Sequence, residues 1–153
     1  GMASKLAAAK IAAWSGVRAV IAGADSPGVV VDAIEGQSVG TSFLPRPERL
    51  SSRKLWIAFA RGSAGRIVVD DGARRALCSE NRSLLPAGVR AIEGAFDVDD
   101  AVEIVDGTGV PFAKGLARYS AAGLREIAGR QTSQLPEGLP HEVVHKDDLV
   151  VLP

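Results

Sequence analysis

The sequence is short of the residues that mark a disulfide-stabilised protein, a membrane protein or a dedicated nucleic-acid binder. Cys78 is the only cysteine among 153 residues, so no disulfide can form within the chain. This suits a reducing compartment, and we expect a cytoplasmic protein in which Cys78 is a small buried hydrophobe. No apolar run approaches the ~20 residues that a membrane-crossing helix needs, so we expect no membrane partner.

Charge of one sign is also in short supply. Lys and Arg together number 18, as do Asp and Glu. Proteins that bind nucleic acids usually carry a basic excess, which this chain lacks overall. Aromatic residues make up 5% of the chain, whereas hydrophobic residues make up 46%. The composition therefore predicts a folded protein whose core is mainly aliphatic.

The first 45 residues alternate between helix and strand patterns. Residues 2–15 are rich in alanine and predict a helix, and residues 17–22 predict a buried strand of the parallel kind. Ser26 and Pro27 suit the cap and first turn of a second helix over residues 28–35. A second strand is expected at 40–44. This order is typical of an α/β fold, but the segment is too short to bury a sizeable core alone.

Two prolines and several charged residues interrupt the pattern after residue 45. We expect a linker over residues 46–64 that contains the boundary between two domains.

The remaining residues predict short strands with two short helices, which is typical of a small mixed barrel. Asp71 and Ser120 are the expected caps of helices at 72–79 and 120–128. Asp106–Gly109 is the expected turn between two strands. The expected strands cover 67–69, 89–96, 102–105, 111–117, 143–145 and 149–152.

Five stretches carry a resemblance to a known family, in the family's order. Val69-Asp70-x-Gly72-Ala73 and Ser83-Leu84-Leu85-Pro86-x-Gly88-Val89 resemble the PUA domain, in the variant found in bacterial glutamate 5-kinases. Gly1-Met2-Ala3-Ser4-Lys5 resembles the end of that family's Thr-Gly-Gly-Met-x-Thr-Lys nucleotide loop, with Ser4 retaining the hydroxyl. The other two matching stretches are Ser26–Val29 with Gly36 and Gly40–Phe43, and Arg53-Lys54-x-Trp56-Ile57.

The resemblance implies a mixed α/β chain in two parts. Residues 1–45 would be the end of an amino-acid-kinase domain, 46–64 a linker, and 65–153 a β-rich PUA pseudobarrel with short helices. The parent enzyme would transfer the γ-phosphoryl group of ATP, with Mg²⁺, to the side-chain carboxylate of L-glutamate in proline biosynthesis.

The same resemblance implies which residues belong to the site. Gly1, Met2, Ala3, Ser4 and Lys5 would bind the nucleotide. The catalytic aspartate and the glutamate-binding segments belong to parts of the family outside this chain. We therefore expect no catalytic residue here and no activity from this chain alone.

Two other functions remain open. The PUA domain could act directly as an RNA-binding module through its arginines, or serve as a structural module in a homo-oligomer. Arginine binds phosphate well, but acidic residues accompany each candidate, which favours a solvated surface of mixed charge. The candidate arginines are Arg74, Arg75, Arg82, Arg118 and Arg125.

Acidic and histidine clusters do not predict a metal site. Asp70 and Asp71 suit a helix N-terminus. The acidic residues Asp97, Asp99 and Asp100 lack the spacing of a calcium loop. His141 and His145 have helical spacing, but Pro140 and the β-branched residues between them oppose a helix.

Overall fold

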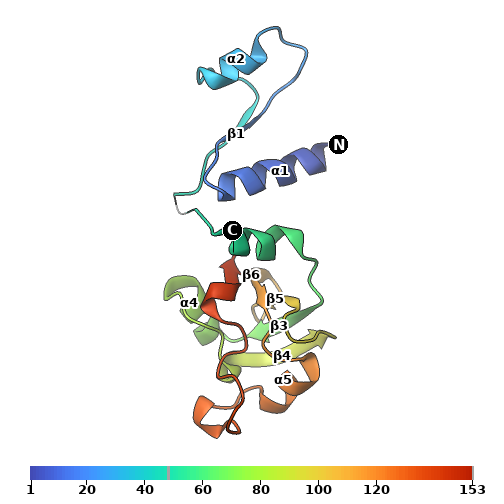
Figure 1. The fold of residues 1–153 in the computed structure, drawn as a ribbon, viewed down its shortest axis with the longest axis vertical. Coiled ribbons are helices and arrows are strands. Elements are labelled where there is room, and N and C mark those ends of the chain that lie inside the picture. Colours follow the sequence, from blue (N-terminus) through green and yellow to red (C-terminus); the bar gives the residue numbers. More distant parts are fainter. Residues whose placement is uncertain (48, 153) are drawn as a thin grey trace. The chain divides into compact units, whose positions relative to one another are not determined.

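The computed structural model describes residues 1–47 and 49–152, and these form two compact units (Figure 1). One unit is Gly1–Leu55 and the other begins at Trp56. Residue 48 of the expected linker and residue 153 of the expected PUA domain lie outside the described residues. The mixed α/β fold class is confirmed.

The N-terminal unit contains helices α1 (Met2–Trp14), α2 (Val29–Ile34) and α3 (Ser52–Leu55) and strands β1 (Ala19–Ile21) and β2 (Thr41–Phe43). Helix α1 buries Ala9, Ala13 and Trp14. The guanidinium of Arg46 lies 4.2 Å from the Trp14 ring centroid, a cation–π contact.

The prediction that residues 17–22 form a buried strand of the parallel kind was wrong in two respects. Strand β1 pairs antiparallel with β2, with Ile21 opposite Thr41, and its side chains are only partly buried. The ends of the two strands nearest to α2 are therefore adjacent, and α2 lies on the segment that joins them (Figure 1). A connection that returns to the same end of a strand gives an antiparallel pair.

The expected cap of the second helix was also wrong. Gly28, with φ of 81°, is the N-cap of α2, and no side chain caps the helix. Ser26 contributes its backbone carbonyl, which accepts from the Val29 N–H at 3.3 Å.

The C-terminal unit is built on a five-stranded sheet in the order β4-β3-β5-β6-β7. Strand β3 pairs in parallel with β5, and the other neighbouring pairs are antiparallel. Its elements are η1 (Trp56–Ala60, a π-helical turn), β3 (Gly65–Val69), α4 (Asp71–Ser79), η2 (Pro86–Gly88), β4 (Val89–Gly94), β5 (Ala101–Val105), β6 (Pro111–Leu116), α5 (Ala121–Ile127), η3 (Thr132–Gln134), η4 (Lys146–Asp148) and β7 (Leu149–Val151).

An aliphatic core with few aromatics fills this unit, as the composition predicts. The fully buried side chains include Ile67, Ile104 and Leu124. Strand β5 is the central strand of the sheet, between β3 and β6, and is buried along most of its length. The turn at 106–109 joins β5 to antiparallel β6, as predicted.

Of three further local predictions for this unit, one is confirmed and two need correction. Ser120 caps α5, accepting from the Gly123 N–H at 3.2 Å, as expected. Asp70, and not Asp71, is the N-cap of α4. Cys78 is exposed on α4, next to buried Leu77. Helical periodicity turns neighbouring residues to different faces, so a short helix can bury only one of the two.

The strand predicted at 143–145 is only one bridge, between Val144 and Leu84. The Val143 carbonyl accepts from the Arg118 N–H at 2.8 Å, while the Val144 carbonyl accepts from the Leu84 N–H at 2.9 Å. Successive carbonyls thus go to different segments, and η4 begins two residues later, which leaves no length for a ladder.

The segment predicted as a linker over 46–64 is partly helical. It contains α3 and η1, and Ile57 within η1 is fully buried in the C-terminal unit. None of the helices in the described residues has both the length and the apolar character needed to cross a membrane.

Candidate functional site

The five residues predicted to bind nucleotide form the first turn of α1. Gly1 is the N-cap, and its carbonyl accepts from the Ser4 hydroxyl at 2.8 Å. The terminal ammonium of Gly1 donates to the same hydroxyl oxygen at 3.4 Å. The Ser4 side chain therefore stabilises the turn, while the first backbone N–H groups of a helix have no partner within it. Such groups favour an anion.

Lys5 is the charged side chain of this turn, and it borders two hollows of the N-terminal unit. One, of about 470 Å³, lies between α1 and β1 and is lined by Ala8, Ala12 and Val20. The other, of about 330 Å³, extends to Gly40 and Thr41 at the start of β2. The exposed ammonium group thus stands beside open volume.

The donors of this turn fit a phosphate group but not a divalent cation. Backbone N–H groups and a lysine bind phosphate oxygens, whereas Mg²⁺ binds oxygen ligands, among them carboxylates. Within residues 1–47 and 49–152, no three His, Cys, Asp or Glu side chains are grouped in a way that could hold a metal ion.

A second concave surface lies on the C-terminal unit, between α4 and residues 82–88. This groove of about 300 Å³ is lined by Ala76, Arg82, Ser83 and Leu85, among others. Gly88 allows the close approach of η2 to α4, because a Cβ atom there would lie 2.5 Å from the Ala73 Cβ. The Ser-Leu-Leu-Pro-x-Gly-Val stretch thus forms one wall of the groove.

Asp70 connects α4 to β4 beside this groove, through both of its carboxylate oxygens. Its Oδ1 accepts from the Ala73 N–H at 2.8 Å, and its Oδ2 accepts from Arg90 at 2.7 Å. Its own N–H donates to the Gly88 carbonyl at 3.0 Å. The sequence indicated a helix N-terminus at Asp70 but gave no sign of Arg90, which lies 20 residues away.

We expect Asp70→Ala to destabilise the C-terminal unit by about 1–2 kcal/mol, because α4 loses its cap and Arg90 its partner. Asp70→Asn is the matched control, because the amide oxygen can still cap the helix, and its loss should be about 1 kcal/mol or less. Urea unfolding monitored by circular dichroism measures both. Equal losses for the two variants would contradict the capping role.

Asp106 is a nearly buried carboxylate whose role the sequence indicated only as a turn residue. Its Oδ1 accepts from the Thr108 hydroxyl at 2.6 Å and from the N–H groups of Thr108 and Val110. These hydrogen bonds, chiefly that of the Thr108 hydroxyl, lower the pKa of Asp106 despite burial, with help from Arg74 at 3.8 Å. The charged form is therefore the one that the fold stabilises.

A carboxylate with a lowered pKa stabilises the folded state above its ordinary pKa, and this contribution is lost as the pH falls through the folded value. We therefore expect Asp106→Asn to be less stable than the parent at pH 7, with the difference shrinking below about pH 5. Thermal unfolding from pH 7 to pH 3 measures this. A difference that is constant across that range would show that Asp106 contributes nothing through its charge.

Lys114 and Tyr119 are buried polar residues that the sequence did not single out. Lys114 donates to the Arg61 carbonyl, and burial lowers the pKa of Lys114, opposed by Glu103. The Tyr119 hydroxyl donates to the Pro140 carbonyl, and burial raises the pKa of Tyr119. The sequence signal for the burial of Lys114 was that Phe112 and Leu116, two positions to either side in β6, are apolar and share its face of the strand.

Both units of the chain resemble known proteins. The PUA domain family matches residues 65–139. Over 155 residues the chain is 46% identical to the glutamate 5-kinase of Syntrophotalea carbinolica, covering 99% of this chain and 42% of that protein. The chain is homologous to the C-terminal part of glutamate 5-kinases.

Other relatives show the same pattern. The glutamate 5-kinase of Mycolicibacterium smegmatis is 45% identical over 150 residues, covering 98% of this chain and 40% of that protein. The chain thus spans about two fifths of the length of these relatives. A solved PUA domain from Aeropyrum pernix K1, crystallised with tartrate, is 26% identical with a TM-score of 0.43, covering 61% of this chain and 48% of that one.

The arginines considered for RNA binding mostly have partners within the PUA-containing unit. Arg82 pairs with Glu80 at 2.8 Å, and Arg118 pairs with Glu142 at 3.3 Å. Arg74 lies 3.8 Å from Asp106, and Arg125 donates to the Gly94 carbonyl at 3.0 Å. Arg75 is exposed on α4. Three of these arginines, Arg74, Arg82 and Arg118, are thus paired with acidic side chains, as the expectation of mixed charge requires.

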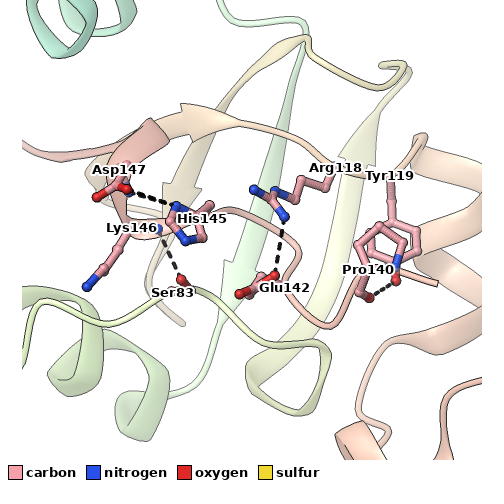
Figure 2. Close-up of polar contacts among 8 residues, drawn as sticks. All are labelled: Ser83, Arg118, Tyr119, Pro140, Glu142, His145, Lys146 and Asp147. Carbon is pink, nitrogen blue, oxygen red and sulfur yellow. Dashed lines mark hydrogen bonds and ion pairs between the residues drawn. The ribbon is translucent and has the colours of Figure 1, made fainter. Parts of the chain in front are cut away.

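Polar contacts tie the segment after Pro140 to the rest of this unit (Figure 2). Figure 2 shows Arg118 reaching Glu142 and Tyr119 reaching Pro140. The Ser83 hydroxyl accepts from the Lys146 N–H at 3.0 Å. These contacts hold the segment that precedes β7 in place.

His145 and Asp100, two of the residues weighed as metal ligands, make local hydrogen bonds instead. His145 Nδ1 accepts from the Asp147 N–H at 3.2 Å at the start of η4. Asp100 accepts from the Asp97 N–H at 2.9 Å, and Asp99 has a φ of 67° in the same turn.

Proposed function

We propose that this chain is the C-terminal part of an enzyme that transfers the γ-phosphoryl group of ATP to the side-chain carboxylate of L-glutamate, a step of proline biosynthesis. The observation that carries the proposal is 46% identity to a glutamate 5-kinase over 99% of the chain, through both units. A PUA domain alone occurs in unrelated proteins, so the match to the N-terminal unit is what favours the kinase.

In this proposal the first turn of α1 binds the phosphates of ATP. Gly1, Met2, Ala3 and Ser4 contribute backbone N–H groups, and Lys5 places a positive charge beside the open hollows next to β1 and β2. Phosphoryl transfer depends mainly on positioning and on neutralising charge on the transferring group. The helix N-terminus would position the phosphates, and Lys5 would neutralise charge on the transferring group.

Mg²⁺, when bound with ATP, would supply positive charge at the phosphates, and the carboxylates that hold it would come from residues outside this chain. The described residues supply no acidic cluster for it. The groups that bind glutamate would also come from residues outside this chain. We therefore propose that this chain alone is inactive. We further propose a cytoplasmic, homo-oligomeric parent protein, with the PUA domain as a structural module.

The test uses a chimera in which the N-terminal part of the Syntrophotalea carbinolica enzyme precedes Gly1. We expect ATP-dependent phosphorylation of glutamate by the chimera and none by this chain alone. Lys5→Met in the chimera should lower kcat on the order of 100-fold. The variant removes the positive charge of Lys5, which would stabilise the negative charge of the transition state.

Lys10→Met is the matched control, since Lys10 is an exposed lysine on the same helix. It should leave kcat unchanged within about twofold, since it removes a charge away from the first turn. Equal activities for the Lys5 and Lys10 variants would remove Lys5 from the nucleotide site, and turnover by the isolated chain would contradict the proposed division of the enzyme.

A further inference from the structure

The C-terminal end of α1 is held by the chain that follows β2. The last four carbonyl groups of a helix have no partner within it. In α1, the Ala13 carbonyl accepts from the Arg46 N–H at 2.9 Å. The Trp14 carbonyl accepts from the Leu50 N–H at 3.3 Å. Backbone groups that are distant in sequence therefore fix this end of the helix.

Two arginine side chains of the same segment pack on this helix end. The Arg46 guanidinium lies 4.2 Å from the Trp14 ring centroid, a cation–π contact. The Arg49 side chain lies over Gly16, since a Cβ atom at Gly16 would be 3.6 Å from the Arg49 Cβ. Positive charge is favourable at the C-terminus of a helix, so the charges of both arginines also favour this arrangement.

Trp14 is the large buried side chain of α1. The other residues that α1 buries are Ala9 and Ala13. Alanine side chains are too short to interdigitate deeply with a neighbouring element, and interdigitation is what fixes how a helix packs. Trp14 is only 5% exposed. The contact between its ring and Arg46 therefore fixes the helix more specifically than the alanines do.

The opposite end of α1 is the first turn, Gly1–Lys5, which in the proposed function binds the phosphates of ATP. The helix has 13 residues, and such a helix is roughly 20 Å long. A tilt of about 3° at its C-terminal end would move the first turn by about 1 Å. A misplacement of that size is enough to weaken the binding and the transfer of a phosphoryl group.

We infer that Arg46 is a positioning residue for ATP. Its contact with Trp14 holds α1 so that the backbone N–H groups of the first turn and the ammonium group of Lys5 meet the phosphates. Arg46 acts through the helix rather than by touching the nucleotide. This inference rests on the proposed function, because that proposal places ATP at the first turn of α1.

Equilibrium dialysis of radiolabelled ATP with Mg²⁺ tests the inference on the chimera described above, because it measures binding without turnover. We expect Arg46→Ala to weaken ATP binding about tenfold, since the first turn loses its fixed position. Arg46→Lys should bind ATP within about threefold of the unsubstituted chimera, because a lysine also places a cation over the ring.

Arg18→Ala is the matched control for the binding measurement. Arg18 is an exposed arginine of the same unit, and its guanidinium donates to the Ser42 hydroxyl at 3.0 Å rather than stacking on Trp14. The substitution removes the same charge and the same length of side chain. It should leave the affinity for ATP unchanged within about twofold.

Kinetics of the same variants separate positioning from loss of folded protein. Displacement of the first turn by Arg46→Ala should raise the KM for ATP about tenfold and leave the KM for glutamate unchanged within about twofold. Partial unfolding would instead lower kcat and leave both KM values unchanged, because the folded fraction keeps its native site. A change of that second kind would overturn the inference.

A double-mutant cycle tests whether Arg46 acts through Trp14. Trp14→Leu removes the ring and keeps an apolar helix-forming residue, and it should weaken ATP binding about as much as Arg46→Ala does. Adding Arg46→Ala to Trp14→Leu should then cause no further loss, because both substitutions remove one contact. A full additional loss would show that Arg46 does not act through Trp14.

Equal ATP affinities for the Arg46→Ala and Arg18→Ala chimeras would overturn the inference. An unsubstituted chimera that binds no ATP would contradict both the inference and the proposed nucleotide site. A chimera that shows the expected differences in ATP binding but does not phosphorylate glutamate would contradict the proposed reaction alone. An active chimera whose variants bind ATP equally would contradict this inference alone.

Discussion

Replacing Ile57 with alanine should lower the free energy of unfolding of the C-terminal unit by about 2–5 kcal/mol. Ile57 is fully buried, and the π-helical turn η1 that carries it contacts β6 and β7. Shortening the side chain leaves a cavity in that contact. For a unit of this size, such a loss should lower Tm by roughly 10–20 °C.

Thermal unfolding of the full chain measures this effect, with Val110→Ala as the control. Val110 is 56% exposed, so its replacement should change stability by about 0.5 kcal/mol or less. If Ile57→Ala were as mild as Val110→Ala, η1 would not belong to the folding unit of the PUA domain.

This prediction bears on where the PUA-containing unit begins. The family match starts at residue 65, whereas the structural unit starts at Trp56. Two further contacts hold the intervening segment: Lys114 donates to the Arg61 carbonyl, and Arg61 donates to the Asp99 carbonyl at 3.0 Å. A protein that starts at Gly65 should therefore be less stable than one that starts at Trp56.

Gly115→Ala should destabilise the same unit by about 2–3 kcal/mol, because β6 has no space for a side chain there. A Cβ atom at this position would lie 2.4 Å from Val144 Cγ1 and 2.9 Å from the Asp148 carbonyl oxygen. Val144 is fully buried and Asp148 contributes backbone, so neither can move away easily.

Gly62→Ala is the matched control, since a Cβ atom there would meet nothing within 4 Å. It should be neutral or slightly stabilising, because alanine restricts the unfolded chain. Urea unfolding of the two variants, followed by tryptophan fluorescence and circular dichroism, gives the difference. A Gly115→Ala variant as stable as Gly62→Ala would mean that the 140–149 segment is less closely packed on β6.

Local signals in the sequence were reliable where one short segment contains the whole cause. The Ser120 cap, the 106–109 turn and the positions of most helices and strands follow from residue type and spacing. The first-turn residues Gly1–Lys5 were likewise found by sequence, and their nucleotide role stays a prediction.

The errors share a different origin, which is pairing between distant residues. Val143–His145 has the composition of a strand, yet its carbonyls bond to Arg118 and Leu84, so no ladder forms. Residues 17–22 look like a buried parallel strand, yet their partner β2 runs antiparallel. Neither partner can be identified from the segment itself.

The features of the fold and of the candidate sites likewise fall into those with a local cause and those that depend on distant residues. The sequence alone determined a two-part α/β chain with an aliphatic core, a helix N-terminus ending in Lys5, and a PUA-type half, because composition, periodicity and motifs are local properties. Only the tertiary structure decided that Ile57 belongs to the C-terminal core, that Arg90 holds Asp70, and that Lys114 is buried. It also decided that Val30 and Ile34, on α2, line an open groove beside β1. Each of these depends on which distant segments meet, and burial and pairing are properties of that meeting rather than of any residue.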